Sequence, residues 1–178
     1  MSENETETTN SQSIKEHIDK LCNLGVNIIN YIKQKGFDTP LDPSLLRLAS
    51  IGLNFISSAK ITNTFIGRSY KYWDKIQKKD ETFLIENCDV LFNGLDQESI
   101  KNFSNIFAAK QSDGTSVLPI ETKESIWELL KAIVCNCIRH IHKIRSRDPI
   151  SGKYTVTYIS DISVRLESKN WAIDNLDY

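Results

Sequence analysis

The longest regular pattern of apolar positions in the chain runs from residue 121 to residue 147. Apolar side chains recur there every three or four residues, which is the spacing of one face of a helix. Asp148-Pro149 ends the pattern, because the residue before a proline disfavours helical backbone. The apolar face covers nearly half of the helix circumference, which predicts a helix that lies inside a core. Its members are Ile126, Trp127, Leu130, Ile133, Val134, Cys137, Ile138, Ile141 and Ile144.

Several segments upstream of this one also have helical periodicity, and local signals mark where they begin. Ser13 and Glu16 have the spacing of a capping box. Asp42 before Pro43 combines a good N-cap with a proline at the first helical position. Asp80 has the same capping chemistry. The predicted helices span residues 13–35, 43–59, 61–77, 81–93 and 97–110, and the second either ends near Ser57-Ser58 or continues into the third.

The period changes after residue 147. Residues 153–159 and 162–166 are rich in β-branched and aromatic side chains, and apolar and polar positions alternate in both. This pattern is typical of strands, and the short polar stretch between them predicts a β-hairpin. The acidic tail that follows carries three apolar side chains as candidate contacts with a partner: Trp171, Ile173 and Leu176.

These patterns predict a mainly α-helical single domain, since 178 residues are a common length for one domain. Five or six helices are expected to surround the helix of residues 121–147. A polar, acidic arm at residues 1–12 is expected to be disordered, because it has almost nothing to bury. The predicted organisation is therefore an arm (1–12), a helical domain (13–147), and a hairpin with a tail (148–178).

Charge and composition narrow the kinds of partner. The formal net charge is −1, so no overall field attracts nucleic acid or a membrane surface. No apolar run approaches the roughly 20 residues of a membrane-spanning helix, so no membrane span is expected. The four cysteines lie inside helical patterns rather than in loops with disulfide spacing. Free thiols in a reducing intracellular compartment are the expectation.

No residue pattern indicates catalysis. Cys135, Cys137, His140 and His142 are potential zinc ligands by residue type. On a helix, however, Cys135 and Cys137 point about 160° apart, so one ion could not collect all four side chains. Cys137 is expected in the apolar stripe, and Cys135 on the polar side. We therefore expect a protein that is not an enzyme and has no metal or cofactor.

Two basic clusters are the strongest signal for nucleic acid. The first alternates with aromatic residues, which can stack on bases while lysine and arginine contact phosphates. The second lies near the end of the 121–147 helix, where basic residues also favour the helix dipole. Both clusters can equally be the solvated side of core-packed helices. Their members are Arg68, Lys71, Lys75, Lys78 and Lys79 in the first, and Arg139, Lys143, Arg145 and Arg147 in the second.

Residues 81–143 contain TFLIENCDVLFNGLDQESIKNFSNIF and, further on, SIWELLKAIVCNCIRHIHK. This segment resembles uncharacterised α-helical proteins of nucleocytoplasmic large DNA viruses. The resemblance implies a late or virion-associated protein and no catalytic residues. The expected function is a structural or protein-interaction role in a viral particle or its assembly, with other protein subunits as partners, capsid or virion components among them. The alternative is a nucleic-acid-binding protein that uses the two basic clusters.

Overall fold

The computed structural model describes residues 3–37, 39, 41–87, 89 and 97–147. This part of the chain is mainly helical, as the sequence predicted, and contains no β-strand beyond one isolated bridge between Lys110 and Ser116. The elements are α1 (Glu3–Gln34), α2 (Pro43–Leu53), α3 (Ser58–Ser69), η1 (Tyr70–Tyr72), α4 (Trp73–Gln77), α5 (Glu81–Glu86), α7 (Gln97–Ala108) and α8 (Ile120–Arg147).

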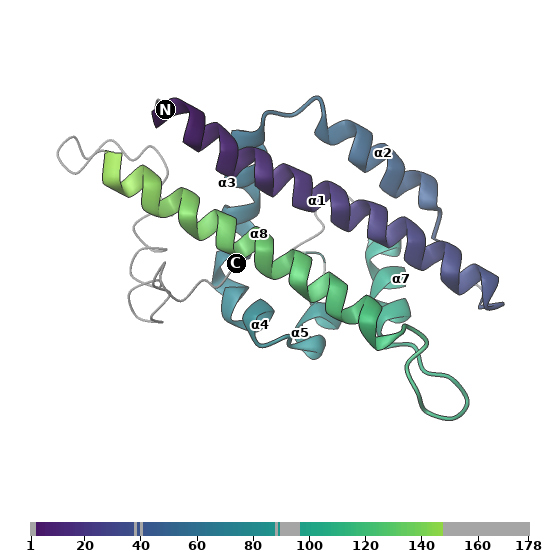
Figure 1. The fold of residues 1–178 in the computed structure, drawn as a ribbon. Coiled ribbons are helices and arrows are strands. Elements are labelled where there is room, and N and C mark those ends of the chain that lie inside the picture. Colours follow the sequence, from purple (N-terminus) through teal and green to yellow (C-terminus); the bar gives the residue numbers. More distant parts are fainter. Residues whose placement is uncertain (1–2, 38, 40, 88, 90–96, 148–178) are drawn as a thin grey trace.

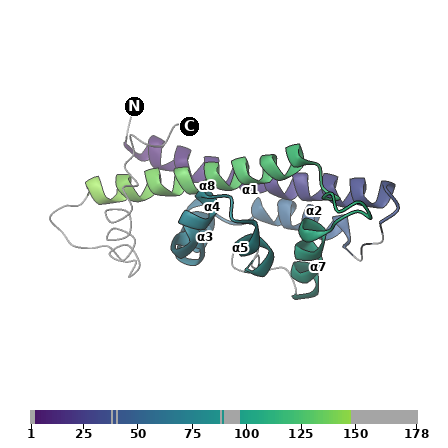
Figure 2. The ribbon, with the colours of Figure 1, turned by 90° about the horizontal axis from the view of Figure 1, so that it is seen from below.

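The two longest helices, α1 and α8, lie side by side along most of their lengths and form one layer (Figure 1). The shorter helices α3, α4, α5 and α7 pack beneath this pair, as the second view shows (Figure 2). Helix α2 also packs on α1, on the side away from α8. The fold is therefore a long helix pair with a layer of short helices below it and one helix, α2, at its edge.

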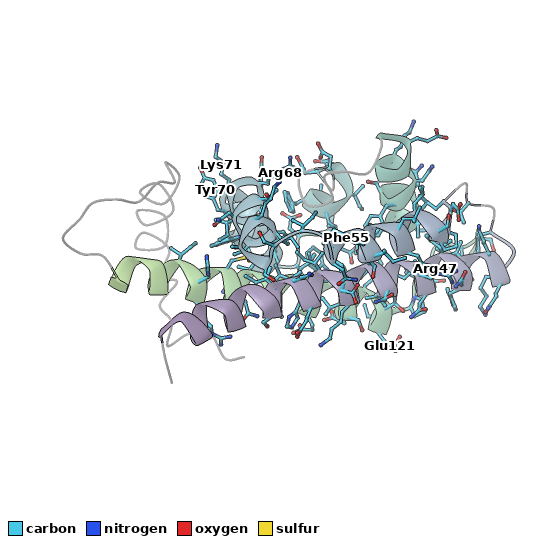
Figure 3. The ribbon with its side chains drawn as sticks, turned by 90° about the horizontal axis from the view of Figure 1, so that it is seen from above. Arg47, Phe55, Arg68, Tyr70, Lys71 and Glu121 are labelled. Carbon is cyan, nitrogen blue, oxygen red and sulfur yellow. The ribbon has the colours of Figure 1, made fainter. Side chains whose placement is uncertain are left out.

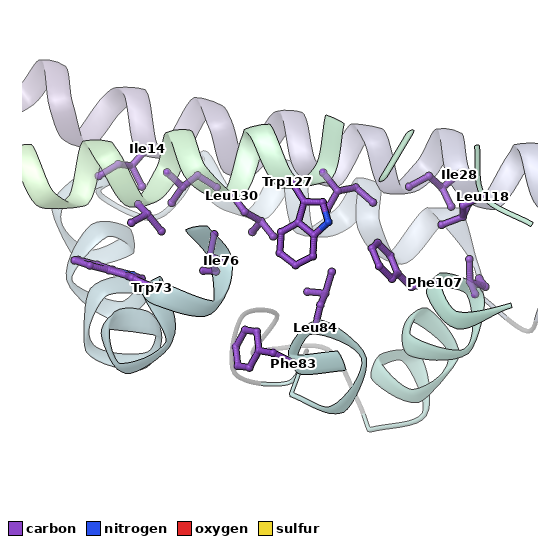
Figure 4. Close-up of a cluster of buried hydrophobic side chains, with 14 of the residues drawn as sticks. Ile14, Ile28, Trp73, Ile76, Phe83, Leu84, Phe107, Leu118, Trp127 and Leu130 are labelled. Carbon is purple, nitrogen blue, oxygen red and sulfur yellow. The ribbon is translucent and has the colours of Figure 1, made fainter. Parts of the chain in front are cut away.

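The apolar face predicted for the 121–147 helix is the centre of the core. Ile126, Leu130, Ile133 and Ile138 on α8 are all at most 1 % exposed. Trp127 packs against Phe107 of α7 with ring centroids 6.3 Å apart and planes at 89°, the edge-to-face arrangement that aromatic pairs favour. Figure 4 shows Leu130, Trp127 and Phe107 with side chains of α1, α4 and α5 around them. The prediction of an interior helix is confirmed.

The helix boundaries follow the local chemistry that the sequence indicated. The carboxylate of Asp42 accepts a hydrogen bond from the backbone N–H of Ser44, and Pro43 occupies the first turn of α2. Asp80 caps α5 in the same way through the N–H of Phe83, at 3.0 Å. Gly36 follows α1 with φ of 79°, the left-handed conformation that ends many helices.

Two predictions concern the ends of the chain. The arm of residues 1–12 was expected to be disordered and the first helix to begin at Ser13, whereas α1 begins at Glu3. Once the apolar part of a helix is docked, each added residue extends it at little cost, and glutamates near the N-terminus favour the dipole. The predicted hairpin and tail, residues 148–178, lie outside the described residues.

The middle of the chain is more finely divided than predicted. The helix expected over 43–59 ends earlier, at Leu53, but the break that the sequence allowed near Ser57-Ser58 is present. Ser57 caps a new helix there by accepting a hydrogen bond from the N–H of Lys60. The segment expected over 61–77 is interrupted by the short 3₁₀ turn η1. Periodicity alone does not reveal such breaks, because the apolar positions on either side can share one helical phase.

Replacing Trp127 by alanine is expected to lower the free energy of unfolding by about 3–5 kcal/mol, because a large buried ring is lost and a cavity remains. Urea unfolding followed by circular dichroism measures this loss. Glu121→Ala, an exposed change one and a half turns earlier on α8, is the control and should change stability little. A loss below about 1 kcal/mol for Trp127→Ala would contradict the placement of this ring in the core.

Candidate protein-interaction surface

Helix α2 is fixed to the fold by one side only. Leu46 lies so close to Gly25 of α1 that a Cβ atom at residue 25 would be 2.7 Å from Leu46 Cδ1. Beside this contact, the hydroxyl of Ser50 donates a hydrogen bond to the carboxylate of Asp19 on α1. The absence of a side chain at Gly25 thus lets the two helices approach closely, and the Ser50–Asp19 bond sets which side of α2 faces α1.

The opposite side of α2 is apolar and exposed. No residue of this helix is buried. The side chain of Phe55, just after the helix, is 86 % exposed, Leu48 is 62 % exposed and Ile51 is 55 % exposed. We define the α2 face as five exposed apolar side chains: Leu45, Leu48, Ile51, Phe55 and Ile56.

The size of this surface sets it apart from scattered exposed apolar residues. Large apolar side chains each present on the order of 200 Å², so the exposed parts of the α2 face amount to roughly 500 Å². Contiguous apolar patches of this size on soluble proteins are often functional. Gly52 lies within the face, and a Cβ atom there would meet nothing within 4 Å. The surface therefore includes an open position between larger side chains.

Charged groups lie around the α2 face rather than on it. Arg47 is exposed near the middle of α2, and Figure 3 labels it together with Phe55, which follows the helix. At the start of α2, hydrogen bonds from Ser44 lower the pKa of Asp42, and the nearby charges of Lys33 and Arg47 contribute further. The carboxylate is therefore ionised at neutral pH and stabilises the first turn of the helix.

A small apolar cavity lies beneath the first turns of α2. Gly25, Leu41, Leu46 and Phe103 are among the residues that line it. Its volume is about 30 Å³, enough for a water molecule but far below that of a small-molecule site. Any ligand of this region would therefore bind on the α2 face, not in the space behind it.

The first basic cluster lies mainly at the surface of the fold. Arg68, Lys71 and Lys78 are exposed. The ammonium group of Lys71 lies 5.8 Å from the ring centroid of Tyr70, and both are drawn beside Arg68 in Figure 3. Trp73, which could have stacked on a base, is instead 3 % exposed and donates its ring N–H to Ser69. Trp73 is therefore part of the core and is not available to stack on a base.

The other two lysines of this cluster hold helices together. Lys75 pairs with Asp80 at 2.9 Å. Lys79 pairs with Glu124 and, at 3.6 Å, with Glu128, both on α8. Lys79 has φ of 54°, which is uncommon for a residue other than glycine, and this conformation accompanies its pairing with α8. These two cations are thus matched by carboxylates and contribute little free positive charge.

The second basic cluster lies on the C-terminal half of α8, where Arg139 is partly buried. Lys143, Arg145 and Arg147 belong to the final turns of α8, and their side chains lie outside the described part of the chain. The candidate partner contacts in the tail also lie outside the described residues: Trp171, Ile173 and Leu176.

The cysteines of α8 are buried thiols. Cys137 is 0 % exposed, as expected, but Cys135, expected on the polar side, is only 4 % exposed, because α8 is covered on more of its circumference than one stripe. Burial raises the pKa of Cys135 and raises that of Cys137 well above its usual value. Thiols of this kind are poor nucleophiles at neutral pH. Within the described residues, no three His, Cys, Asp or Glu side chains are grouped to hold a metal ion.

Comparisons with known proteins found no matching family, no matching characterised protein and no matching solved structure. In the described part of the chain, none of the helices is both long and apolar enough to cross a membrane.

Periodicity predicted only a helix over residues 43–59 and did not distinguish the α2 face. The signal was present in the sequence: Leu48 and Ile51 fall on one side of α2, whereas Leu46 and Leu53 fall on the other, and Leu45 lies between the two sides. A helix that is apolar all round is normally enclosed by other elements. One with an exposed apolar side therefore indicates a missing partner.

The Asp80 carboxylate makes stability depend on pH. Its pKa is lowered by the N–H of Phe83 and by Lys75, so its contribution to stability is present above its unfolded pKa of about 3.9 and is lost as pH falls through the lower folded value. Asp80→Asn keeps a capping side chain without the charge. We expect the difference in urea midpoint between wild type and variant to be present at pH 7 and to vanish in strong acid. A difference that does not change with pH would contradict this role.

Proposed function

We propose that this protein works by protein contact rather than catalysis, and that the α2 face is its binding surface. The observation that supports this most is the set of five exposed apolar side chains on one side of a helix whose other side is fixed to α1. Water contact with such a surface is unfavourable, and covering it gains about 25 cal/mol for each Å² of apolar area removed.

The form of the surface favours an α-helix as the bound element. The α2 face follows a helix of 11 residues, and it offers ridges of side chains instead of a strand edge. Helices pack on such surfaces with their axes about 8–10 Å apart and with side chains seated between those of the neighbour. Because no charged residue lies on the α2 face, the partner helix would present an uncharged apolar stripe.

We further propose a structural or assembly role among other protein subunits, such as those of a viral particle. This part rests on the resemblance of residues 81–143 to α-helical proteins of large DNA viruses. A contact surface without a catalytic centre suits a subunit that joins others. In the structure, the exposed α2 face supports this role.

A role in nucleic-acid binding is the alternative, with Arg68, Lys71 and Lys78 as its best candidates. The pairing of Lys75 and Lys79 with carboxylates weighs against it, because paired cations release few counterions on binding. We expect fluorescence anisotropy with a generic DNA duplex to show weak binding in about 50 mM salt, with a shallow dependence on salt. Tight binding that Arg68→Glu with Lys71→Glu abolishes would favour the alternative.

A photoreactive phenylalanine analogue at position 55 tests the proposed surface in cells that express the chain. Phe55 is replaced by a residue of similar shape, so the fold should not change. We expect discrete cross-linked products that contain a second protein chain, because the probe lies in the contact.

The matched control carries the same analogue at Gln77, an exposed position of α4 outside the α2 face. It should give no such product. Leu48→Asp in the Phe55 probe background should remove the products by placing a charge in the apolar contact. Equal cross-linking from positions 55 and 77, or none from 55, would refute the proposal.

A further inference from the structure

Resting on the proposed function, we infer that the α2 face binds a second copy of the same chain. The two α2 helices would lie antiparallel across a two-fold axis that passes close to residue 50. Three observations support this inference. Gly52 has no role within the chain, Leu48 is placed so that it can pack on Gly52 of a second copy, and the exposed apolar area is large enough for a small dimer interface.

Gly52 has no explanation inside the chain. Gly25 must lack a side chain because Leu46 occupies the space, but a Cβ atom at Gly52 would meet nothing. Gly52 also lies within α2, and its φ is not positive, so the backbone does not require glycine. Glycine in a helix costs about 1 kcal/mol relative to alanine. A side chain from outside the chain that seats over Gly52 would account for it.

A second copy supplies that side chain. With about 100° per residue, Leu48 and Gly52 project within roughly 40° of each other on the outer side of α2. In an antiparallel pair centred on residue 50, Leu48 lies opposite the partner's Gly52, and Gly52 lies opposite the partner's Leu48. Toward the ends of the pair, Leu45 is level with the partner's Phe55. Each copy thus places one large side chain over the glycine of the other, on both sides of the axis.

Charge favours the antiparallel arrangement over the parallel one. The α2 face itself carries no charge, so the two-fold axis brings no like charges together at its centre. In the antiparallel pair, the two Arg47 residues are separated by about 9 Å along the axis in addition to the distance between helices. A parallel pair would place them side by side. The antiparallel pair also sets the two helix dipoles in opposition, which is favourable.

The area fits a weak, reversible dimer. Roughly 500 Å² on each copy gives about 1,000 Å² in total, which is the lower limit for a specific interface. Interfaces at this lower limit are typical of weak and transient association. Association would then follow the local concentration of the protein.

Sedimentation equilibrium of the purified full chain, from about 1 to 200 µM, tests the dimer. We expect wild type to be a dimer at the upper end, and Leu48→Asp to weaken association at least tenfold. Gly52→Leu is the decisive variant, because it enlarges the apolar surface but fills the position that receives Leu48. We expect it to weaken association at least tenfold, whereas non-specific apolar adhesion would become stronger.

Asn54→Leu is the matched control, since it adds the same side chain at an exposed residue that points away from the α2 face. It should leave the dimer unchanged. Circular dichroism verifies that each variant is folded, and a Cβ atom at Gly52 meets nothing within 4 Å in a single copy. A monomeric wild type, or a stronger dimer with Gly52→Leu, would overturn the inference.

Cross-linking of the purified protein from the Phe55 probe determines the direction of the two helices. Mass spectrometry should locate the adduct at residues 43–48 of the partner, near Leu45, and an adduct near the partner's own residue 55 would overturn the antiparallel arrangement. The two proposals can also fail separately. A purified monomer whose probe captures a different protein in cells refutes the second copy but retains the α2 face, whereas no product in either setting refutes both.

Discussion

The packing of α8 against α1 is the interaction on which the rest of the fold depends. Both helices are long, and each buries an apolar side that no short helix could cover alone. Each large side chain buried there contributes about 1.5–3 kcal/mol. The short helices α3, α4, α5 and α7 complete the enclosure from below, and they are positioned by the side chains that α8 presents to them. Trp127 with Phe107, and Lys123 with Glu81 at 3.0 Å, are contacts of this kind.

The sequence predicted the parts of the fold that depend on local chemistry and on one long period. The core role of α8 and the caps at Asp42 and Asp80 were recognised because periodicity and capping act over a few residues. The break at Leu53 and the start of α1 at Glu3 depend on which neighbours stabilise each turn. That information is not local. Lys75 and Lys79 were predicted as candidate nucleic-acid contacts because their carboxylate partners become evident only in the folded chain.

The two sides of helix α2 have different surroundings. Its inner side packs closely against Gly25 of α1, and its outer side is apolar although the fold leaves it exposed to water. A chain selected for folding alone would carry polar residues on the outer side. The exposed leucines and isoleucines are therefore best explained by a contact outside the single chain. The two glycines illustrate the difference, because one is required by packing within the chain and the other is not.

Dissolved ions should act to different extents on the two layers of this molecule. The short helices are joined to α8 by apolar burial and also by exposed pairs such as Lys79 with Glu124, and mobile counterions screen pairs of this kind. The long pair is held by apolar burial, which strongly hydrated anions reinforce. Raising the concentration of such a salt would therefore stabilise the lower layer less than the upper one. Partial opening of the short helices would then become easier than collapse of the whole domain, so amide exchange would become less uniform along the chain.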